Sequence, residues 1–448
     1  MKTVITYGIF DLFHEGHVRL LERAKALGDR LIVGVCTDQY AYERGKFTVV
    51  DSLETRLKHV MACPAVDQVI IEDHFGQKVE DIARYHADIF AIGDDWLGKF
   101  DHLNKLCHVV YLPRTPGVSS SLLRAQRYST LRLGVIGCGR IVERFLQETF
   151  HVHDIRVVSF FHPRPDSSAS AAAFRQRHPD ITLSRTPEKL FDQVDAVYVA
   201  APHSSHARYT RAALEAGRHV LCEKPLSFDG EEAEALFSLA KRQGLVLMEG
   251  IKTAYCPGFL ELISLCCSGM IGEIRDIDAS FTRLTAPGLR EWTDREYGGS
   301  FAEFGSYVLL PVVKLFGDSV MDWSFHSIWE DGVDAFTRFL AVGDGISASG
   351  KTGIGVKTHG ELVISGTKGY LTACPPWWKT TGFEFNYEDP KQIKRYVSSF
   401  EGDGLRYEIA DFLYRVRGYE GREYKLLPEE SIRIAEVYGR FQKGRVRG

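Results

Sequence analysis

Two histidines stand three residues apart in the segment GIFDLFHEGH, which covers residues 8–17. An apolar run that predicts a strand precedes this segment, and apolar residues at helical spacing follow it. His14 and His17 therefore lie on the same side of the first helical turn. Free backbone N–H groups and the positive end of the helix dipole favour an anion such as phosphate there. A metal site is the alternative for such a pair, but Gly16 and the strand–helix context favour phosphate.

A glycine turn follows another predicted strand in the segment LRLGVIGCGRIV, residues 131–142. Gly137 and Gly139 allow the tight turn and the close backbone approach that a dinucleotide pyrophosphate requires. The third position of this pattern usually carries Gly or Ala, whereas here it is Val142. The turn therefore needs support from other segments before it indicates a dinucleotide site.

Lys224 gives that support, because it stands in the segment CEKP, residues 222–225, directly after a predicted strand. Hydride delivery to a carbonyl leaves an alkoxide, which needs a proton and a cation nearby. Lys224 can supply both, and Tyr307 is a second candidate for the proton. An exposed ion pair with Glu223 is the alternative interpretation of this lysine.

The predicted strand that follows the glycine turn ends in the segment FFHPRPD, residues 160–166. This segment bears on which dinucleotide binds. Sites that prefer NAD usually place an acid there, which binds the ribose 2′-hydroxyl. No acid occurs before Asp166, while His162 and Arg164 can bind a 2′-phosphate. The segment therefore favours NADP(H) over NAD(H).

The elements that must position these residues form two successive α/β series. Short apolar runs alternate with helical patterns over residues 1–126 and again from Leu131, which predicts two parallel, doubly wound sheets. From about residue 272 the strands are longer and alternate in polarity without intervening helices, which predicts a mostly antiparallel sheet. A last helix is expected over Arg406–Arg415, before a basic tail. The expected domains are residues 1–126, 131–250 and 251–448.

Composition excludes several classes of protein. The 448 residues are 44% hydrophobic and carry a net charge of −4, so nothing indicates nucleic acid or an anionic membrane as a partner. No run approaches the roughly 20 apolar residues of a membrane span. The nine cysteines are odd in number and never spaced as CxxC, which favours reduced thiols and a cytoplasmic location over disulfides or zinc.

Residues 1–126 resemble the glycerol-3-phosphate cytidylyltransferases of the nucleotidylyltransferase superfamily. The matching segments are GIFDLFHEGH (8–17), VDQVI (66–70), GDDWLGKFD (93–101) and RTPGVSSS (114–121). The resemblance implies a Rossmann-like domain that transfers CMP from CTP to a polyol phosphate. The products would be a CDP-polyol and pyrophosphate, with Mg²⁺ carried by the CTP and no metal held by the protein itself.

For this site the resemblance implies that His14 and His17 hold the α- and β-phosphates of CTP. Lys46 would neutralise phosphate charge, and Asp11 and Asp94 would contact the polyol or the ribose and base. The remaining residues expected to bind the nucleotide are Gly8, Ile9, Phe10, Arg114, Thr115, Ser119 and Ser120. Ile9 stands where a small hydroxyl residue is expected, so one contact is altered. Arg114 is also expected to act in catalysis.

Residues 131–448 resemble the Gfo/Idh/MocA oxidoreductases, most specifically through the Glu-Lys-Pro motif and the segment GGSFAEFGSY, residues 298–307. The resemblance implies a Rossmann domain followed by an α+β domain with a mostly antiparallel open sheet. Glu303 stands where the family usually has Asp, so its carboxyl lies one methylene further out. The expected cofactor-binding residues are Gly137, Cys138, Gly139, Arg140, Ile141, His162, Arg164, Pro202, His203, His206, Glu223 and Lys224.

Together these features predict a bifunctional enzyme that reduces a small sugar or keto-sugar to a polyol and activates the polyol phosphate with CTP. The CDP-polyol would serve a surface polysaccharide or a teichoic-acid-like polymer. Two alternatives remain: the second module is a non-catalytic scaffold that senses NADP, or it reduces an unrelated sugar. Both families commonly self-associate, so a homo-oligomer is expected.

Overall fold

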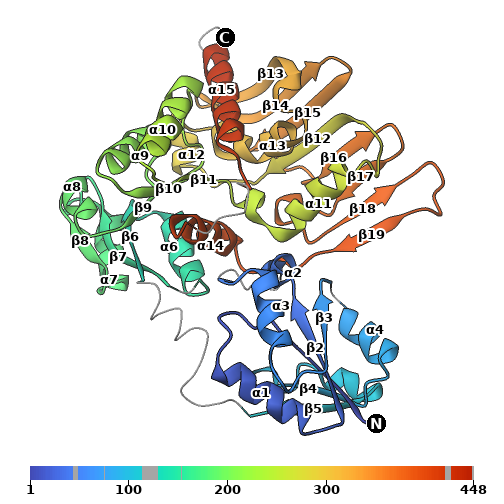
Figure 1. Ribbon diagram of the computed structural model, residues 1–448. Helices are drawn as coiled ribbons and strands as arrows, with labels where there is room; N and C mark the ends of the chain where they lie inside the picture. Colours follow the sequence, from blue (N-terminus) through green and yellow to red (C-terminus); the bar gives the residue numbers. More distant parts are fainter. Residues whose placement is uncertain (44–48, 75, 114–129, 153, 419–424, 446–448) are drawn as a thin grey trace. The chain divides into compact units, whose positions relative to one another are not determined.

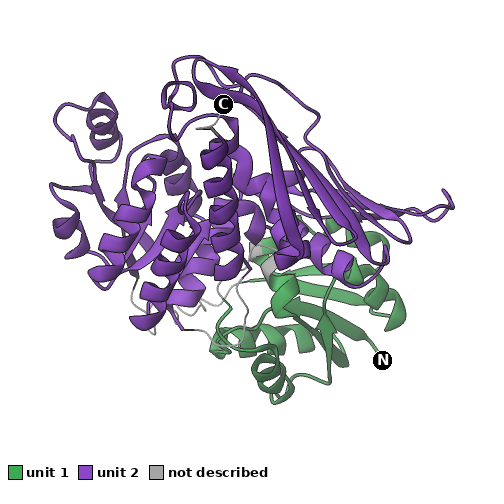
Figure 2. Cartoon of the chain, turned by 90° about the horizontal axis from the view of Figure 1, so that it is seen from above, with its two compact units in different colours: residues 1–130 green, residues 131–448 purple. Residues whose placement is uncertain are grey.

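The computed structural model describes residues 1–43, 49–74, 76–113, 130–152, 154–418 and 425–445. The chain divides into two compact units, Met1–Thr130 and Leu131–Gly448, which Figure 2 shows in different colours. Each unit is described by itself below. None of the described helices combines the length and the apolar character that crossing a membrane requires.

The first unit is built on a five-stranded parallel sheet with the strand order β3-β2-β1-β4-β5. Its central strands are fully buried runs of Val, Ile, Leu and Phe, as a parallel sheet covered on both faces requires. The order reverses between β1 and β4, where such sheets usually bind ligands at the carboxyl ends of the strands. The elements are β1 (Thr3–Gly8), α1 (Glu15–Lys25), β2 (Arg30–Cys36), α2 (Asp38–Glu43), α3 (Leu53–Met61), β3 (Gln68–Glu72), α4 (Gln77–Arg84), β4 (Ile89–Gly93) and β5 (His108–Leu112).

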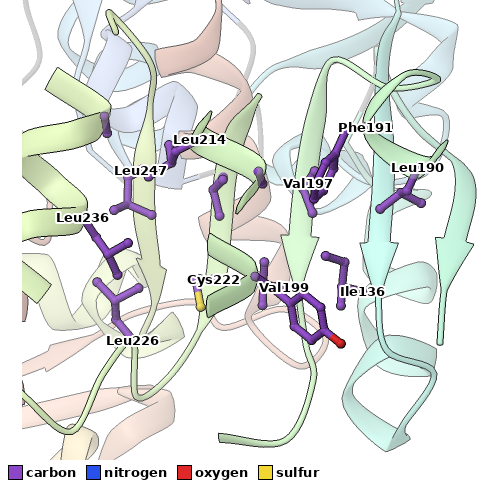
Figure 3. Packing of buried hydrophobic residues seen from close by; sticks show 14 of the residues in the cluster. Ile136, Leu190, Phe191, Val197, Val199, Leu214, Cys222, Leu226, Leu236 and Leu247 are labelled. Carbon is purple, nitrogen blue, oxygen red and sulfur yellow. The ribbon is translucent and has the colours of Figure 1, made fainter. Parts of the chain in front are cut away.

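The second unit begins with a six-stranded parallel sheet in the order β11-β10-β9-β6-β7-β8. Figure 3 shows its core, in which Val197 and Val199 of the middle strand pack between the flanking helices. The elements are β6 (Leu131–Ile136), α6 (Arg140–Thr149), β7 (Ile155–Phe161), α7 (Ala169–Arg177), β8 (Thr182–Ser184), α8 (Pro187–Phe191), β9 (Ala196–Val199), α9 (His206–Glu215), β10 (His219–Glu223), α10 (Gly230–Arg242) and β11 (Leu247–Gly250).

The same unit continues into an eight-stranded sheet in the order β13-β14-β15-β12-β16-β17-β18-β19. Only the β12–β15 pair is parallel, so the expectation of a mostly antiparallel sheet is confirmed. Its strands are β12 (Ile274–Thr282), β13 (Val320–Glu330), β14 (Val333–Gly343), β15 (Ile346–Gly353), β16 (Leu362–Gly366), β17 (Tyr370–Ala373), β18 (Gly382–Asn386) and β19 (Lys394–Val397).

Helices in this region correct two expectations. The short α12 (Arg290–Thr293) and the long α13 (Ser300–Phe316) separate β12 from β13, whereas no helix was expected there. α13 is apolar on nearly all sides and is buried against the sheet, so it lacks the polar face that marks a surface helix (Figure 1). The last helix is not the expected one, because α14 (Leu405–Val416) is followed by α15 (Pro428–Arg445). The rest of the unit includes α11 (Pro257–Cys267).

Candidate active sites

The histidine pair of the first unit lies where β1 passes into α1. His14 is the N-cap residue of α1, and its Nδ1 accepts a hydrogen bond from the backbone N–H of Gly16 at 3.0 Å. The rings of His14 and His17 stack with their centroids 3.9 Å apart. The structure therefore brings the two imidazoles together at the positive end of the helix.

Burial makes both rings neutral hydrogen-bonding groups. It lowers the pKa of His14, and burial together with the neighbouring His14 lowers the pKa of His17 to about 3. Because Nδ1 of His14 accepts a hydrogen bond, its proton is assigned to Nε2. Nδ1 of His17 is buried and has no hydrogen-bond partner among the described residues. Both rings can therefore act as N–H donors to a phosphate oxygen.

The loop before the histidines has an unusual backbone. Phe10 and Leu12 adopt left-handed conformations, with φ of 57° and 48°. This folds the Phe10 ring back over Gly8, where a Cβ would lie 2.9 Å from two of the ring carbons. Phe10 also contacts His17 edge-on, with 5.4 Å between the ring centroids. Glycine at position 8 is thus required by the Phe10 ring, which in turn supports the histidine.

Arg56 holds this loop in place, although no motif in the sequence points to this residue. Its side chain is fully buried. Nη1 donates to the carbonyl oxygens of Ile9 and Cys36, both at 2.7 Å, and Nε donates to that of Asp51 at 3.0 Å. Nη2 pairs with Asp38. A single guanidinium therefore ties the ends of β1 and β2 to the start of α3.

The two predicted aspartates lie in different surroundings. Oδ1 of Asp11 accepts the backbone N–H groups of Val50 and Asp51 at 2.8 and 2.9 Å, so this carboxylate fastens the loop to the segment before α3. Asp94 follows β4, which pairs with β1 in parallel, so it lies at the same sheet edge as the histidines. A substrate contact by either residue stays a prediction. Five further predicted residues, Lys46, Arg114, Thr115, Ser119 and Ser120, lie outside the described residues.

In the second unit the glycine turn leaves room for a ligand. Gly137 has a φ of 120°, and a Cβ there would lie 2.3 Å from the carbonyl oxygen of Ala200. Gly139 is the N-cap residue of α6 with no side-chain cap, and a Cβ there would meet no described atom within 4 Å. A helix start without a side-chain cap, with open space beside Gly139, fits a pyrophosphate. Val142 is fully buried, so the helix accommodates the larger residue.

The other residues of the turn differ in exposure. Cys138 is buried with its Sγ 3.6 Å from the Ser170 hydroxyl, whereas Ile141 is half-buried. Arg140 extends from the turn and pairs with Glu291 of α12. The turn is thus linked directly to the segment that follows β12.

The end of β7 leads to His162 and Arg164. Arg164 is exposed, and its backbone N–H donates to Nδ1 of His162 at 3.2 Å. The nearest acid in the sequence, Asp166, pairs with Arg185. The carboxylate that could have bound a ribose hydroxyl is therefore engaged elsewhere.

Lys224 lies on the strand end expected for it, but with a different partner. The residue is 8% exposed, and Nζ donates to the carbonyl oxygen of Glu303 at 2.9 Å and to its Oε1 at 3.4 Å. The alternative of an exposed ion pair with Glu223 is therefore wrong. Glu223 instead accepts the Tyr198 hydroxyl at 2.7 Å.

His203 lies on the opposite side of Glu303. Nδ1 faces the carbonyl oxygen of Tyr297 at 3.1 Å, and Nε2 lies 3.1 Å from Nη2 of Arg290 and 3.7 Å from Oε2 of Glu303. Burial, then Arg290 and Lys224, lower the pKa of His203 well below its ordinary value. The ring is thus neutral, with its proton on Nδ1.

His206 and Pro202 lie in the same turn. Both ring nitrogens of His206 face carbonyl oxygens, those of Pro225 and Ala201, each at 2.8 Å. This buried ring fastens the start of α9 to the Glu-Lys-Pro turn. Pro202 is the N-cap residue of the short helix His203–Ser205. Cofactor contacts by these two residues stay a prediction.

Tyr307 completes the cluster one helical turn after Glu303. It is buried on α13, and its ring centroid lies 5.9 Å from Nζ of Lys224. Burial, then Glu223, Glu408 and Glu303, raise the pKa of Tyr307 well above its ordinary value. The structure thus brings together Lys224, Glu303 and Tyr307, the three residues of this unit that were expected to act in catalysis.

Comparison with known proteins identifies each half of the chain separately. A family model described as cytidylyltransferase-like matches residues 5–136, and one described as an oxidoreductase family with an NAD-binding Rossmann fold matches residues 131–251. Glycerol-3-phosphate cytidylyltransferase of Bacillus spizizenii is 50% identical over 124 residues, which are 28% of this chain and 95% of the relative.

The second half is similar to sugar oxidoreductases. The NADP⁺-dependent scyllo-inositol 2-dehydrogenase of Bacillus subtilis is 30% identical over 197 residues. The match covers 42% of this chain and 58% of that relative. A crystal structure of a 3-ketoreductase from Actinomadura kijaniata, in complex with TDP-benzene and NADP, superposes with a TM-score of 0.59 and 26% identity. The match covers 69% of this chain and 96% of that one.

Proposed function

Since the chain belongs to the cytidylyltransferase-like family through its first unit and to the Gfo/Idh/MocA oxidoreductases through its second, we propose that it makes a CDP-activated polyol in two steps. The second unit reduces a small sugar or keto-sugar phosphate to a polyol phosphate with NADPH. The first unit then transfers CMP from CTP to that polyol phosphate. The observation that carries the first step is the stacked pair His14 and His17 at the start of α1.

In the transferase step, a phosphate oxygen of the polyol phosphate attacks the α-phosphorus of CTP. A new P–O bond forms, the bond to the β-phosphate oxygen breaks, and pyrophosphate leaves. Negative charge spreads over the α-phosphate oxygens, which fixed donors stabilise. His14 and His17 provide these donors as neutral imidazoles, and the start of α1 adds its dipole. Mg²⁺ would be carried by the triphosphate.

Among the described residues, no three His, Cys, Asp or Glu side chains lie together in a way that could hold a metal. In this proposal metal charge arrives with the nucleotide, and the stacked rings of His14 and His17 bind phosphate oxygens.

In the reductase step, bound NADPH would supply the hydride that converts the substrate C=O into an alkoxide. Lys224 then donates a proton to the alkoxide oxygen, or stabilises it while Tyr307 does so. Glu303 holds the ammonium of Lys224 in place through two contacts, at 2.9 and 3.4 Å. Arg164 and His162 bind the 2′-phosphate, which selects NADPH over NADH.

Two broader proposals accompany this reaction sequence. The CDP-polyol would be destined for a surface polysaccharide or a teichoic-acid-like polymer. The enzyme would also form a homo-oligomer through the open face of its large sheet. There Leu340 and Val342 of β14 and Ile328 of β13 are exposed, and a second copy would bury them.

A product assay tests the two-step proposal. The chain is incubated with CTP, Mg²⁺, NADPH and a panel of sugars, sugar phosphates and polyol phosphates, and products are identified by mass. We expect a CDP-polyol from a polyol phosphate without NADPH, and from one sugar phosphate only when NADPH is present. If none of the substrates in the panel supports NADPH oxidation, the result would instead favour a second unit that serves as a scaffold or sensor.

A further inference from the structure

Glu408, on α14, is a buried carboxyl group that the proposed reaction does not use. Its side chain is fully buried, and neither carboxyl oxygen has a hydrogen-bond partner among the described residues. Two neighbouring buried carboxylates differ from it: Glu223 accepts from Tyr198 and from its neighbour's backbone N–H, and Glu148 accepts two N–H groups of the Arg406 side chain. Leaving an ionised carboxylate buried without a donor is costly.

The carboxyl group of Glu408 lies directly behind the Glu-Lys-Pro turn. A Cβ on Gly250 would lie 3.6 Å from each of its oxygens and 3.3 Å from the carbonyl oxygen of Cys222. Gly250 pairs with Glu223 across the β10–β11 ladder. Glycine at position 250 thus leaves the space that the carboxyl group of Glu408 uses.

The charges around Glu408 balance when one of the nearby carboxyl groups is protonated. Glu148 of α6 is balanced by Arg406, and Lys224, directly after β10, is balanced by Glu303 of α13. The remaining charged groups that face Glu408 are Glu223 of β10 and Lys252 of the short helix Lys252–Tyr255. The carboxyl groups of Glu223 and Glu408 therefore share the single ammonium group of Lys252. That ammonium also donates to the carbonyl oxygen of Asp403 at 2.7 Å.

Titratable hydroxyls and a thiol complete these surroundings. They are Tyr198 of β9, Tyr307 of α13, Tyr255 of the short helix and Cys256 directly after it. Burial raises the pKa of each, so all four are neutral near pH 7 and add no charge. One proton shared by Glu223 and Glu408 therefore makes the cluster neutral.

We propose that Glu408 holds this proton at neutral pH and acts as a positioning residue for the reductase site. Glu223 receives two hydrogen bonds and stays ionised beside Lys224, whereas Glu408 receives none and is the less costly group to protonate. Burial and the neighbouring Glu223 raise the pKa of Glu408 well above its ordinary value, in the same direction. A neutral Glu408 also spares Tyr307 a third nearby negative charge, beside those of Glu223 and Glu303, so its phenol gives up a proton more readily.

The pH dependence of stability tests this proposal without a reductase substrate, so it can fail independently of the proposed function. A carboxyl group protonated only in the folded state costs stability as pH rises from its ordinary pKa to its raised one. The unfolding equilibrium then shifts about tenfold per pH unit. Glu408→Gln keeps a neutral side chain and removes this dependence. Its melting temperature relative to the unmodified chain should therefore rise by about 2–4 °C per pH unit.

Glu249→Gln is the matched control, because burial raises the pKa of Glu249 to about 7. The difference in melting temperature between Glu249→Gln and the unmodified chain should level off above about pH 7. The difference for Glu408→Gln should continue to grow. Infrared spectra at about pH 8 should show a carboxylic acid C=O stretch that Glu408→Gln lacks and Glu249→Gln keeps.

Parallel melting profiles for Glu408→Gln and the unmodified chain would overturn the proposal. So would an acid C=O stretch at about pH 8 that survives in Glu408→Gln. If Glu408→Gln does not fold, the carboxylic acid C=O stretch is measured in Glu249→Gln at the same pH instead. A protonated carboxyl there supports the proposal, and its absence overturns it.

Discussion

The two units use the same structural device, a strand that enters a helix through a turn containing glycine, in opposite ways. At the start of α1 the turn presents side chains, with His14 as the N-cap and His17 stacked on it. At the start of α6 the turn presents no side chain and leaves open space. Gly139 is the N-cap there, and a Cβ on it would meet no described neighbour within 4 Å.

The difference follows from what happens to the phosphate. A phosphate that reacts develops charge in the transition state, and donors directed at that charge accelerate the reaction. A phosphate that only anchors a cofactor needs backbone N–H groups and space. In the second unit the reacting group that we propose is a carbonyl. Its proposed proton donors come from other elements, Lys224 from directly after β10 and Tyr307 from α13.

The largest expected effect separates the two units at His17. His17→Ala should lower CDP-polyol formation by ~10²–10³, the usual loss when one donor to a transition-state anion is removed. NADPH oxidation should not change, because His17 lies in the other unit. Transferase activity within about tenfold of the unmodified chain would show that His17 does not contact the reacting phosphate.

Lys224→Met should produce the reverse pattern. The glycine turn binds the dinucleotide without this ammonium, so the NADPH dissociation constant, measured by fluorescence, should change little. The developing alkoxide needs the ammonium, so kcat should fall by ~10² or more. Unchanged turnover would mean that Lys224 serves only its ion pair with Glu303, and no turnover in either protein would support a sensor or scaffold.

The sequence predicted these sites unequally, for a physical reason. His14 and His17 are three residues apart, so local helix geometry alone brings them together. The contact between Lys224 and Glu303 joins β10 to α13, and the buried Arg56 meets carbonyls from three segments. Those contacts depend on tertiary packing, which the local pattern does not encode.

The same reason explains the fold predictions. The strands of the two parallel sheets are buried on both faces and read as continuous apolar runs, so their pattern identifies them. The large sheet was predicted only as a mostly antiparallel arrangement of longer strands, because the side chains of a strand such as β13 are half-buried or exposed and form no apolar run. α13 was not predicted as a helix, because it is apolar on nearly all sides and lacks the 3.6-residue pattern of a surface helix.

A smaller effect concerns the cofactor. With Asp166 engaged by Arg185, Arg164 should bind the 2′-phosphate, and kcat/KM for NADPH should exceed that for NADH by about tenfold or more. Arg164→Ala should reduce that ratio and leave the value for NADH unchanged. A preference for NADH, or equal values in the unmodified chain, would contradict this assignment.

The smallest effect compares the two glycines of the second turn. Gly139→Ala should leave the melting temperature of the unit nearly unchanged, since its φ of −81° suits alanine and the space is open. It should weaken NADPH binding several-fold by occupying the pyrophosphate space. Gly137→Ala should instead destabilise the unit by about 1–3 kcal/mol, because its φ of 120° strains alanine. Equal effects of the two substitutions on melting and binding would show that the space at Gly139 is not used.

The most direct test of the whole account follows one atom through both units. The intact chain is incubated with CTP, Mg²⁺, a panel of sugar phosphates and NADPH deuterated at the transferred position. Mass spectrometry of the CDP-linked product should then show one deuterium in the polyol, and His17→Ala should accumulate the deuterated polyol phosphate instead. A CDP-polyol that forms only from added polyol phosphate and never contains deuterium would contradict the consecutive reactions that we propose.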